Sequence, residues 1–144
     1  MPDLSFDPLT PTAYLDRAAE AHGDRVAVVD GGQRWTYREL HDRCGRLAGG
    51  LAELAGGRPV AVLAPNSHVM LESHFAVPWA GVPLVALNTR LSPAELAYIV
   101  GHSEAGLLVV DDALAEVGHQ VASLVDARSA GAPPLRLVRV GGPQ

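Results

Sequence analysis

From residue 58 onward, short apolar runs alternate with segments that carry the start signals of helices. The runs lie at residues 59–64, 83–87, 107–110 and 135–140. Each is too short to be a buried helix, and the first three are continuously apolar, as parallel strands covered on both faces are. Strands that alternate with helices predict βαβ units, and three right-handed units build a mainly parallel sheet. We therefore predict an α/β fold in which helices flank the sheet.

The three segments between these runs each begin with residues that can cap a helix. Asn66-Ser67 can cap a helix that ends near Trp79, and Asp111-Asp112 can cap the last helix. The middle helix begins with a capping box, in which the Ser92 oxygen and the Glu95 carboxylate each satisfy a free backbone N–H group. Local capping chemistry therefore supports the alternating pattern.

The N-terminal third predicts a helix, a β-hairpin and a long second helix. The first helix begins at Thr10-Pro11 and ends at Gly23, and strands over residues 25–29 and 34–36 flank a Gly-Gly turn. A second capping box joins Thr36 and Glu39 at the start of the long helix. Its apolar stripe recurs every three or four residues, at Leu40, Cys44, Leu47, Leu51 and Leu54. We expect the hairpin to lie beside the sheet, and residues 1–144 to form a single α/β unit.

The basic residues exclude two classes of enzyme. All 11 of them are arginine, so the chain contains no lysine. A Walker phosphate loop and a Schiff-base enzyme both require lysine. A formal net charge of -5 gives no footprint for nucleic acid. The N-terminus lacks the pattern of a secretory signal, and no apolar run approaches the roughly 20 residues of a membrane span. We predict a cytoplasmic protein without a membrane span.

Three segments are candidates for binding an anion. Gly45–Gly50 lies inside the expected long helix rather than between a strand and a helix, so close helix packing is the favoured interpretation. The loop formed by Asn88, Thr89 and Arg90 has groups that could hold an anion, but hydrogen bonds that hold the loop itself are favoured. Asp111 and Asp112 follow a strand, as a phospho-acceptor pair does, but helix capping explains both.

The histidines and the single cysteine form no metal or nucleophile pattern. His68 and His74 are six residues apart, which places them on opposite sides of a helix. His41 and Cys44 share a helix face, but two ligands without a third do not make a metal site. Cys44 lies on the apolar stripe, where a small buried side chain is expected. We assign no catalytic, cofactor-binding or metal-binding residue.

Several segments follow one another in an order found in one enzyme family. Residues 35–40 have the sequence Trp-Thr-Tyr-Arg-Glu-Leu, and residues 79–88 have Trp-Ala-Gly-Val-Pro-Leu-Val-Ala-Leu-Asn. Between them, residues 60–67 form a strand and turn, and residues 88–96 and 102–105 follow as Asn-Thr-Arg-Leu-Ser-Pro-Ala-Glu-Leu and His-Ser-Glu-Ala. Together they resemble the N-terminal subdomain of the AMP-forming acyl-CoA synthetases, in the adenylating-enzyme superfamily. The resemblance extends from about Thr12 to Val140.

The resemblance implies an activity whose catalytic parts this chain does not match. Complete family members use Mg-ATP to convert a carboxylate to an acyl-adenylate and then transfer the acyl group to CoA. They need a phosphate loop ending in Pro-Lys-Gly, a metal-binding glutamate, a ribose-binding aspartate and a lysine in a C-terminal domain. None of these motifs matches a position here. ATP, magnesium and CoA are therefore implied for a complete member, and no cofactor is assigned to this chain alone.

Three hypotheses follow from these observations. The first is a fragment of an acyl-CoA synthetase that is inactive alone, with a complementing ligase chain as its partner. The second is a non-catalytic interaction module or pseudoenzyme, which associates with itself as a homo-oligomer or with a ligase. The third is an independent small ligand-binding domain. The sequence leaves the acyl substrate open.

Overall fold

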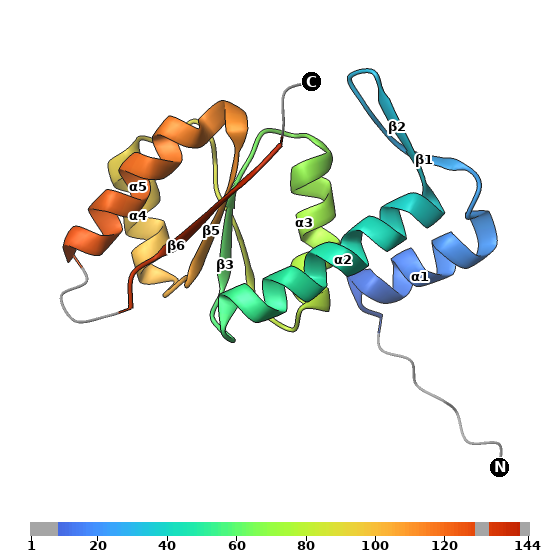
Figure 1. The fold of residues 1–144 in the computed structure, drawn as a ribbon, viewed down its shortest axis with the longest axis horizontal. Coiled ribbons are helices and arrows are strands. Elements are labelled where there is room, and N and C mark those ends of the chain that lie inside the picture. Colours follow the sequence, from blue (N-terminus) through green and yellow to red (C-terminus); the bar gives the residue numbers. More distant parts are fainter. Residues whose placement is uncertain (1–8, 129–132, 142–144) are drawn as a thin grey trace, which may run out of the picture.

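A parallel sheet between two sets of helices organises the molecule, for which a computed structural model describes residues 9–128 and 133–141 (Figure 1). Its strands are β3 (Val60–Leu63), β4 (Leu84–Ala86), β5 (Leu107–Asp111) and β6 (Arg136–Val140). They lie in the order β4-β3-β5-β6, and each neighbouring pair is parallel. The predicted α/β fold with a mainly parallel sheet is confirmed.

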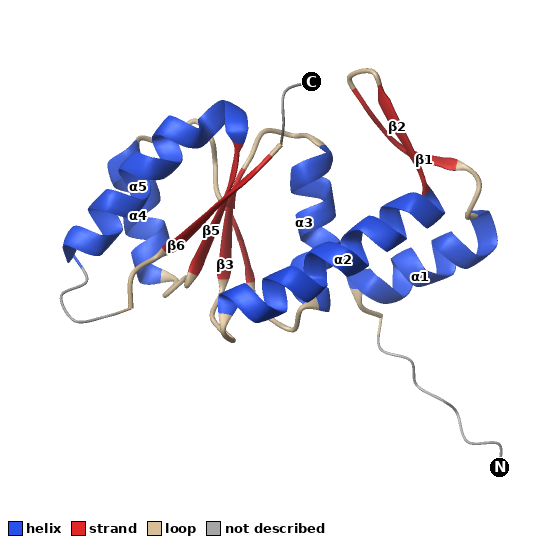
Figure 2. Ribbon diagram, in the orientation of Figure 1, coloured by secondary structure: helices blue, strands red, loops and turns tan. Residues whose placement is uncertain are grey.

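The helices that connect these strands divide between the two faces of the sheet. They are α3 (His68–Trp79), α4 (Pro93–His102) and α5 (Ala115–Arg128). α3 packs on one face, whereas α4 and α5 pack on the other (Figure 2). We call these faces the α2–α3 side and the α4–α5 side, because the long helix α2 (Tyr37–Ala55) shares the first face with α3. The apolar core is accordingly split into two clusters by the sheet.

The predicted cap of the last helix is corrected by the structure. Asp111 accepts a hydrogen bond from the backbone N–H of Ala113 at 3.0 Å, which starts the 3-10 turn η1 (Asp112–Leu114). α5 begins only after this turn, at Ala115. Asp112 instead forms an ion pair with Arg139 of β6, with 2.9 Å between Oδ1 and Nε. The two aspartates therefore fix the turn and the edge strand rather than the first turn of α5.

The N-terminal elements lie outside the parallel sheet. They are α1 (Pro11–His22), the strands β1 (Val26–Asp30) and β2 (Gln33–Thr36), and then α2. β1 and β2 form an antiparallel pair that is a sheet of its own, and this hairpin packs against α2 and α3. The expectation that the hairpin lies beside the parallel sheet is therefore wrong, because helices occupy the space between them (Figure 1).

The apolar stripe of α2 differs from the prediction near its C-terminal end. Leu40, Cys44 and Leu51 are buried as expected, but Leu47 is only half-buried and Leu54 is exposed. Alanines at positions 48 and 55 are buried in their place. A straight helix drifts away from a strict seven-residue repeat, so the buried row moves to the neighbouring position. Small side chains on that row let α2 lie close to α1 and α3.

Among the helices in the described ranges, none is both long and apolar enough to span a bilayer.

Candidate functional site

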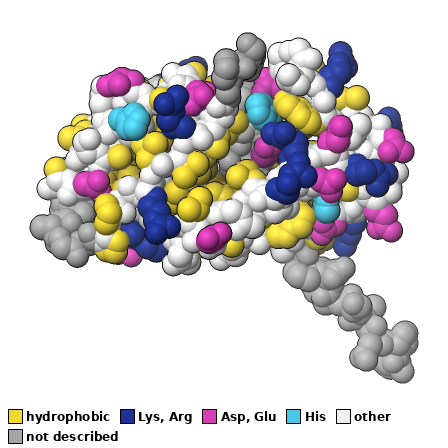
Figure 3. Space-filling view, viewed as in Figure 1, with side chains coloured by type: hydrophobic (Ala, Val, Ile, Leu, Met, Phe, Trp, Pro, Cys, Tyr) yellow, Lys and Arg dark blue, Asp and Glu magenta, His cyan; other side chains and the backbone are white. Residues whose placement is uncertain are grey.

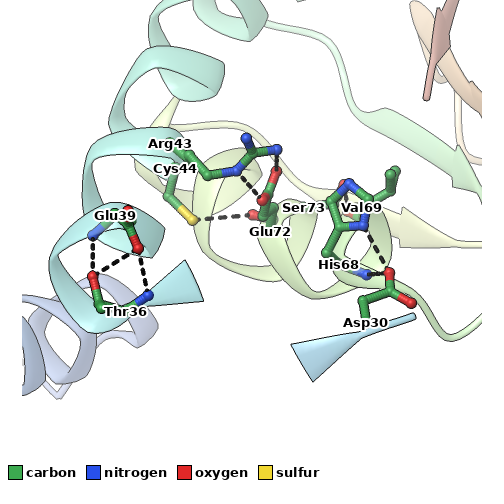
Figure 4. Close-up of polar contacts among 9 residues, drawn as sticks. All are labelled: Asp30, Thr36, Glu39, Arg43, Cys44, His68, Val69, Glu72 and Ser73. Carbon is green, nitrogen blue, oxygen red and sulfur yellow. Dashed lines mark hydrogen bonds and ion pairs between the residues drawn. The ribbon is translucent and has the colours of Figure 1, made fainter. Parts of the chain in front are cut away.

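A network of polar contacts lies where the hairpin, α2 and α3 meet (Figure 4). Asp30, the last residue of β1, accepts two hydrogen bonds from His68, one from its backbone N–H at 2.9 Å and one from ring Nδ1 at 2.7 Å. The backbone bond and then the ring bond hold the pKa of Asp30 below its usual range. A carboxylate from the hairpin thus satisfies the first backbone donor of α3.

This arrangement corrects the expected cap of α3. Ser67 occupies the N-cap position, but its side chain makes no capping hydrogen bond. Its hydroxyl oxygen is buried and has no hydrogen-bond partner within the described ranges. The capping role passes to Asp30, 38 positions away from His68 in the sequence.

Trp35 of β2 joins the same network through its indole ring. The ring centroids of Trp35 and His68 are 4.7 Å apart, and the guanidinium carbon of Arg43 lies 5.1 Å from the Trp35 ring. Arginine favours the face of an indole ring because the ring quadrupole attracts its charge. The hairpin is therefore attached to both helices by stacking as well as by hydrogen bonds.

Arg43 and Glu72 form the most buried ion pair of the network. The Glu72 residue is only 6% exposed, and its two carboxylate oxygens accept hydrogen bonds from Nε and Nη2 of Arg43. This contact raises the pKa of Arg43 above its ordinary value. A carboxylate held in this two-pronged way fixes the plane of the guanidinium group.

Cys44 lies beside this pair and is not a nucleophile. Its thiol is fully buried and donates a weak hydrogen bond to the Glu72 carbonyl oxygen at 3.8 Å. Burial raises the pKa of Cys44 to about 12, so the reactive thiolate is not available near neutral pH. His41, its predicted neighbour, instead contacts Asp16 and Asp42. The interpretation of Cys44 as a small buried side chain is confirmed.

A cavity of 260 Å³ opens next to the network, on the α2–α3 side of β5 and β6. Its polar wall includes Arg43, Arg46, His68, Glu72 and Ser73, and its apolar wall includes Leu51, Val109 and Val140. Figure 3 shows apolar side chains in a hollow between the two layers of helices, bordered by basic side chains and a histidine. The arrangement can receive a small molecule that is charged at one end and apolar at the other.

The other predicted candidates keep local structural roles. The Asn88 side-chain oxygen accepts a hydrogen bond from the Arg90 backbone at 3.0 Å, as a loop-holding role requires. Gly45 packs on the ring of Trp79, whereas Gly49 and Gly50 face open space, so close packing explains only the first of these glycines. His74 contacts the Met70 carbonyl oxygen within its own helix.

Metal ligation finds no support in the same region. Within residues 9–128 and 133–141, no group of three or more His, Cys, Asp or Glu side chains is placed to hold a metal ion.

The sequence singles out His68 and Cys44 as candidates but does not predict the contacts of the network. Asp30, Trp35 and Arg43 carry no local signal, because each acts on a partner far away in the chain. Glu72 carries a usable signal, since it is the only carboxylate of α3, a helix that is mostly apolar and has no arginine or lysine. An isolated carboxylate in such a helix indicates a buried partner.

The fold and these motifs together indicate the N-terminal part of an AMP-forming acyl-CoA synthetase. The chain is an α/β unit with βαβ connections, and both of its capping boxes lie in the family-like segments. Residues 15–139 match the protein family described as AMP-binding enzyme. The chain belongs to this family.

Several relatives of this chain are named CoA ligases. The chain is 40% identical over 109 residues to a peroxisomal acetate/butyrate–CoA ligase of Arabidopsis thaliana, an overlap of 74% of this chain and 19% of the relative. It is 44% identical over 109 residues to a peroxisomal trans-cinnamate:CoA ligase of Petunia hybrida, with the same coverage. An acetate–CoA ligase of Humulus lupulus is 33% identical over 138 residues, covering 93% of this chain and 24% of that one. The chain thus spans about a fifth to a quarter of these relatives.

Solved structures of CoA ligases are also similar to this chain. A putative long-chain-fatty-acid CoA ligase from Rhodopseudomonas palustris matches 92% of this chain and 33% of its own length, with a TM-score of 0.77 and 27% identity. A benzoate CoA ligase from Burkholderia xenovorans matches 90% of this chain and 25% of its own, with a TM-score of 0.76 and 28% identity. The chain therefore resembles the N-terminal part of acyl-CoA ligases, as its motifs predicted.

Proposed function

We propose that this chain is the N-terminal framework of an AMP-forming acyl-CoA ligase and does not activate carboxylates by itself. The family match over residues 15–139 carries the proposal, because it spans only about a fifth to a quarter of relatives that are named CoA ligases. Activation of a carboxylate with ATP and transfer to CoA are properties of the complete enzyme, and a chain that supplies the remaining parts is the expected partner.

The roles of the matched motifs support a framework function. Thr36 and Glu39 close the capping box of α2, and Ser92 and Glu95 close that of α4. Adenylation builds negative charge on phosphorus and on the pyrophosphate leaving group, which must be met by cations and aimed donors. The motif side chains of this unit are instead engaged in holding its helices. The sequence contains no lysine to take the usual phosphate-binding role.

The direct test is carboxylate-dependent ATP–pyrophosphate exchange. The purified 144-residue chain is assayed with acetate, butyrate and benzoate, and the complete acetate/butyrate–CoA ligase of Arabidopsis thaliana serves as the positive control. We expect exchange at the level of the blank for this chain. Exchange that rises with carboxylate concentration would overturn the proposal.

A second candidate function is a non-catalytic interaction module, and the exposed side of β5 and β6 favours it. α5 packs along both strands on the α4–α5 side, but no described helix packs as closely on the α2–α3 side. β6 is also an edge strand, and Val138 and Val140 on it are only half-buried. Apolar surface and a free strand edge both promote association.

Light scattering tests this second function. We expect the purified chain to form a homo-oligomer or to bind a complementing ligase chain, and to enhance the fluorescence of a dye that binds apolar surface. A monodisperse monomer without dye binding would count against it. Five of the relatives are named peroxisomal. The cytoplasmic location expected from the sequence stays a prediction, which microscopy of a tagged chain can check.

A further inference from the structure

We propose that the cavity on the α2–α3 side binds a small organic anion whose charged head meets Arg43 and Arg46 and whose short tail is apolar. The proposal concerns a separate binding site and does not depend on the proposed ligase function. At 260 Å³ the cavity is slightly below the usual range of about 300–1,000 Å³ for ligand pockets, so the ligand is small.

The position of the cavity in the fold is the first argument. The strand order β4-β3-β5-β6 means that the chain leaves β3 toward α3 on one face and leaves β5 toward α5 on the other. Such a reversal opens a crevice outside the carboxyl ends of the two strands, where open α/β sheets bind their ligands. The cavity touches the start of α3 through His68 and Val69 and the end of β6 through Val140, so it lies beside this crevice.

The state of Arg43 is the second argument. Glu72 engages only Nε and Nη2 of its guanidinium group, so three of the five N–H donors have no partner in the described ranges. Because Glu72 is buried and Trp35 lies against the same side chain, the guanidinium group is held in place before a ligand arrives. Figure 4 shows the remaining nitrogen directed away from Glu72. A preorganised donor of this kind suits an anion with two or more oxygens.

The charge balance of the cavity wall is the third argument. The charge of Arg43 offsets that of Glu72, and Asp30 lies behind His68 with its oxygen engaged by that residue. Arg46 follows Arg43 by three positions on α2, shares the cavity wall, and adds a positive charge. The wall therefore attracts an anion, while Leu51, Val109 and Val140 offer an apolar surface to its tail.

Titration of the 15N-labelled chain by NMR tests the proposal with four probes. Butyrate and butyl phosphate carry both an anionic head and a tail, inorganic phosphate carries only the charge, and butan-1-ol carries only the tail. We expect saturable shifts of the Arg46, Val69 and Gly141 amides with at least one of the first two probes. If the ligand of the cavity is a carboxylate, butyrate should bind more tightly than butyl phosphate. If it is a phosphate ester, butyl phosphate should bind more tightly.

Paired variants make the test specific. Arg46→Ala should weaken binding of the better probe about tenfold, because it removes a charge-assisted contact. Arg17→Ala removes the same charge from the exposed face of α1 and should leave the affinity unchanged. Equal affinity for inorganic phosphate, wild-type affinity in Arg46→Ala, an absence of saturable shifts, or shifts centred elsewhere would each overturn the proposal. The readout needs no ATP, so its failure is distinct from failure of the ligase proposal.

Discussion

The two sides of the parallel sheet differ in how completely they are packed. On the α4–α5 side, Leu96, Leu108 and Val121 are fully buried, and Gly118 lies so close to Val110 that a Cβ atom there would approach it to 2.7 Å. On the α2–α3 side, the core is interrupted by a buried ion pair and a cavity, and β6 carries half-buried valines. The closed side stabilises the fold, and the open side is the one for which we propose ligand or partner binding.

The largest expected effect is a difference in stability between two variants, each of which truncates one leucine on one side of the sheet. Leu96→Ala on the closed side should lower the free energy of unfolding by about 3 kcal/mol, because a fully buried leucine leaves a cavity. Leu47→Ala on the open side should cost less than about 1 kcal/mol, since this side chain is half-buried and solvent can fill its place. Urea unfolding measures both, and equal losses would contradict the distinction.

The next effect concerns the ion pair of the open side. Arg43→Ala should lower the free energy of unfolding in urea by about 2 kcal/mol, because it leaves the Glu72 carboxylate buried and unpaired. The double variant Arg43→Met/Glu72→Leu removes both charges and should recover most of this loss. A double variant as unstable as Arg43→Ala would show that the charges themselves are needed.

Local capping should be equally important on both sides. Thr36→Ala removes the cap of α2 and Ser92→Ala that of α4, and each should cost about 1 kcal/mol in thermal or urea unfolding. Thr12→Ala serves as a control, because Thr12 lies within α1 and caps no helix backbone. A large difference between the two cap variants would mean that tertiary packing, not local chemistry, controls their effect.

The smallest effect is confined to acid conditions and involves Asp30. Hydrogen bonds from His68 lower its pKa in the folded state, so they stabilise the fold above the unfolded pKa of about 4. This contribution disappears as the pH falls through the folded pKa. Asp30→Asn should therefore flatten the acid limb of a plot of stability against pH, and Asp24→Asn, at an exposed carboxylate, should leave it unchanged. Identical acid limbs for Asp30→Asn and the wild type would contradict the capping role.

Sequence patterns predicted the elements better than their arrangement. The strands and helices after residue 58 are predicted by short apolar runs and helix-capping residues, which are local signals. The strand order carries no such signal, and neither does the hairpin, whose place is decided by contacts with α2 and α3. Leu54 shows a different limit, because the drift of a straight helix from a strict seven-residue repeat buries Ala55 in its place.

The site was harder to predict than the fold for the same reason. Asp30 and His68 are 38 positions apart, and Arg43 and Glu72 are 29 apart. Serine is a common N-cap residue, so the sequence predicts that Ser67 caps α3. The Asp30 carboxylate of the hairpin takes this role instead, because a charged acceptor makes the stronger hydrogen bond. Charge-assisted contacts between distant elements are set by tertiary packing.

The contrast between a closed and an open side of the sheet is tested most directly by hydroxyl-radical footprinting of the purified chain. Leu96, Leu108 and Val121 on the closed side should be protected from oxidation, because each is fully buried. Leu47, Val138 and Val140 on the open side should be oxidised measurably faster, since each is half-buried. Equal protection of the two sets would contradict the account.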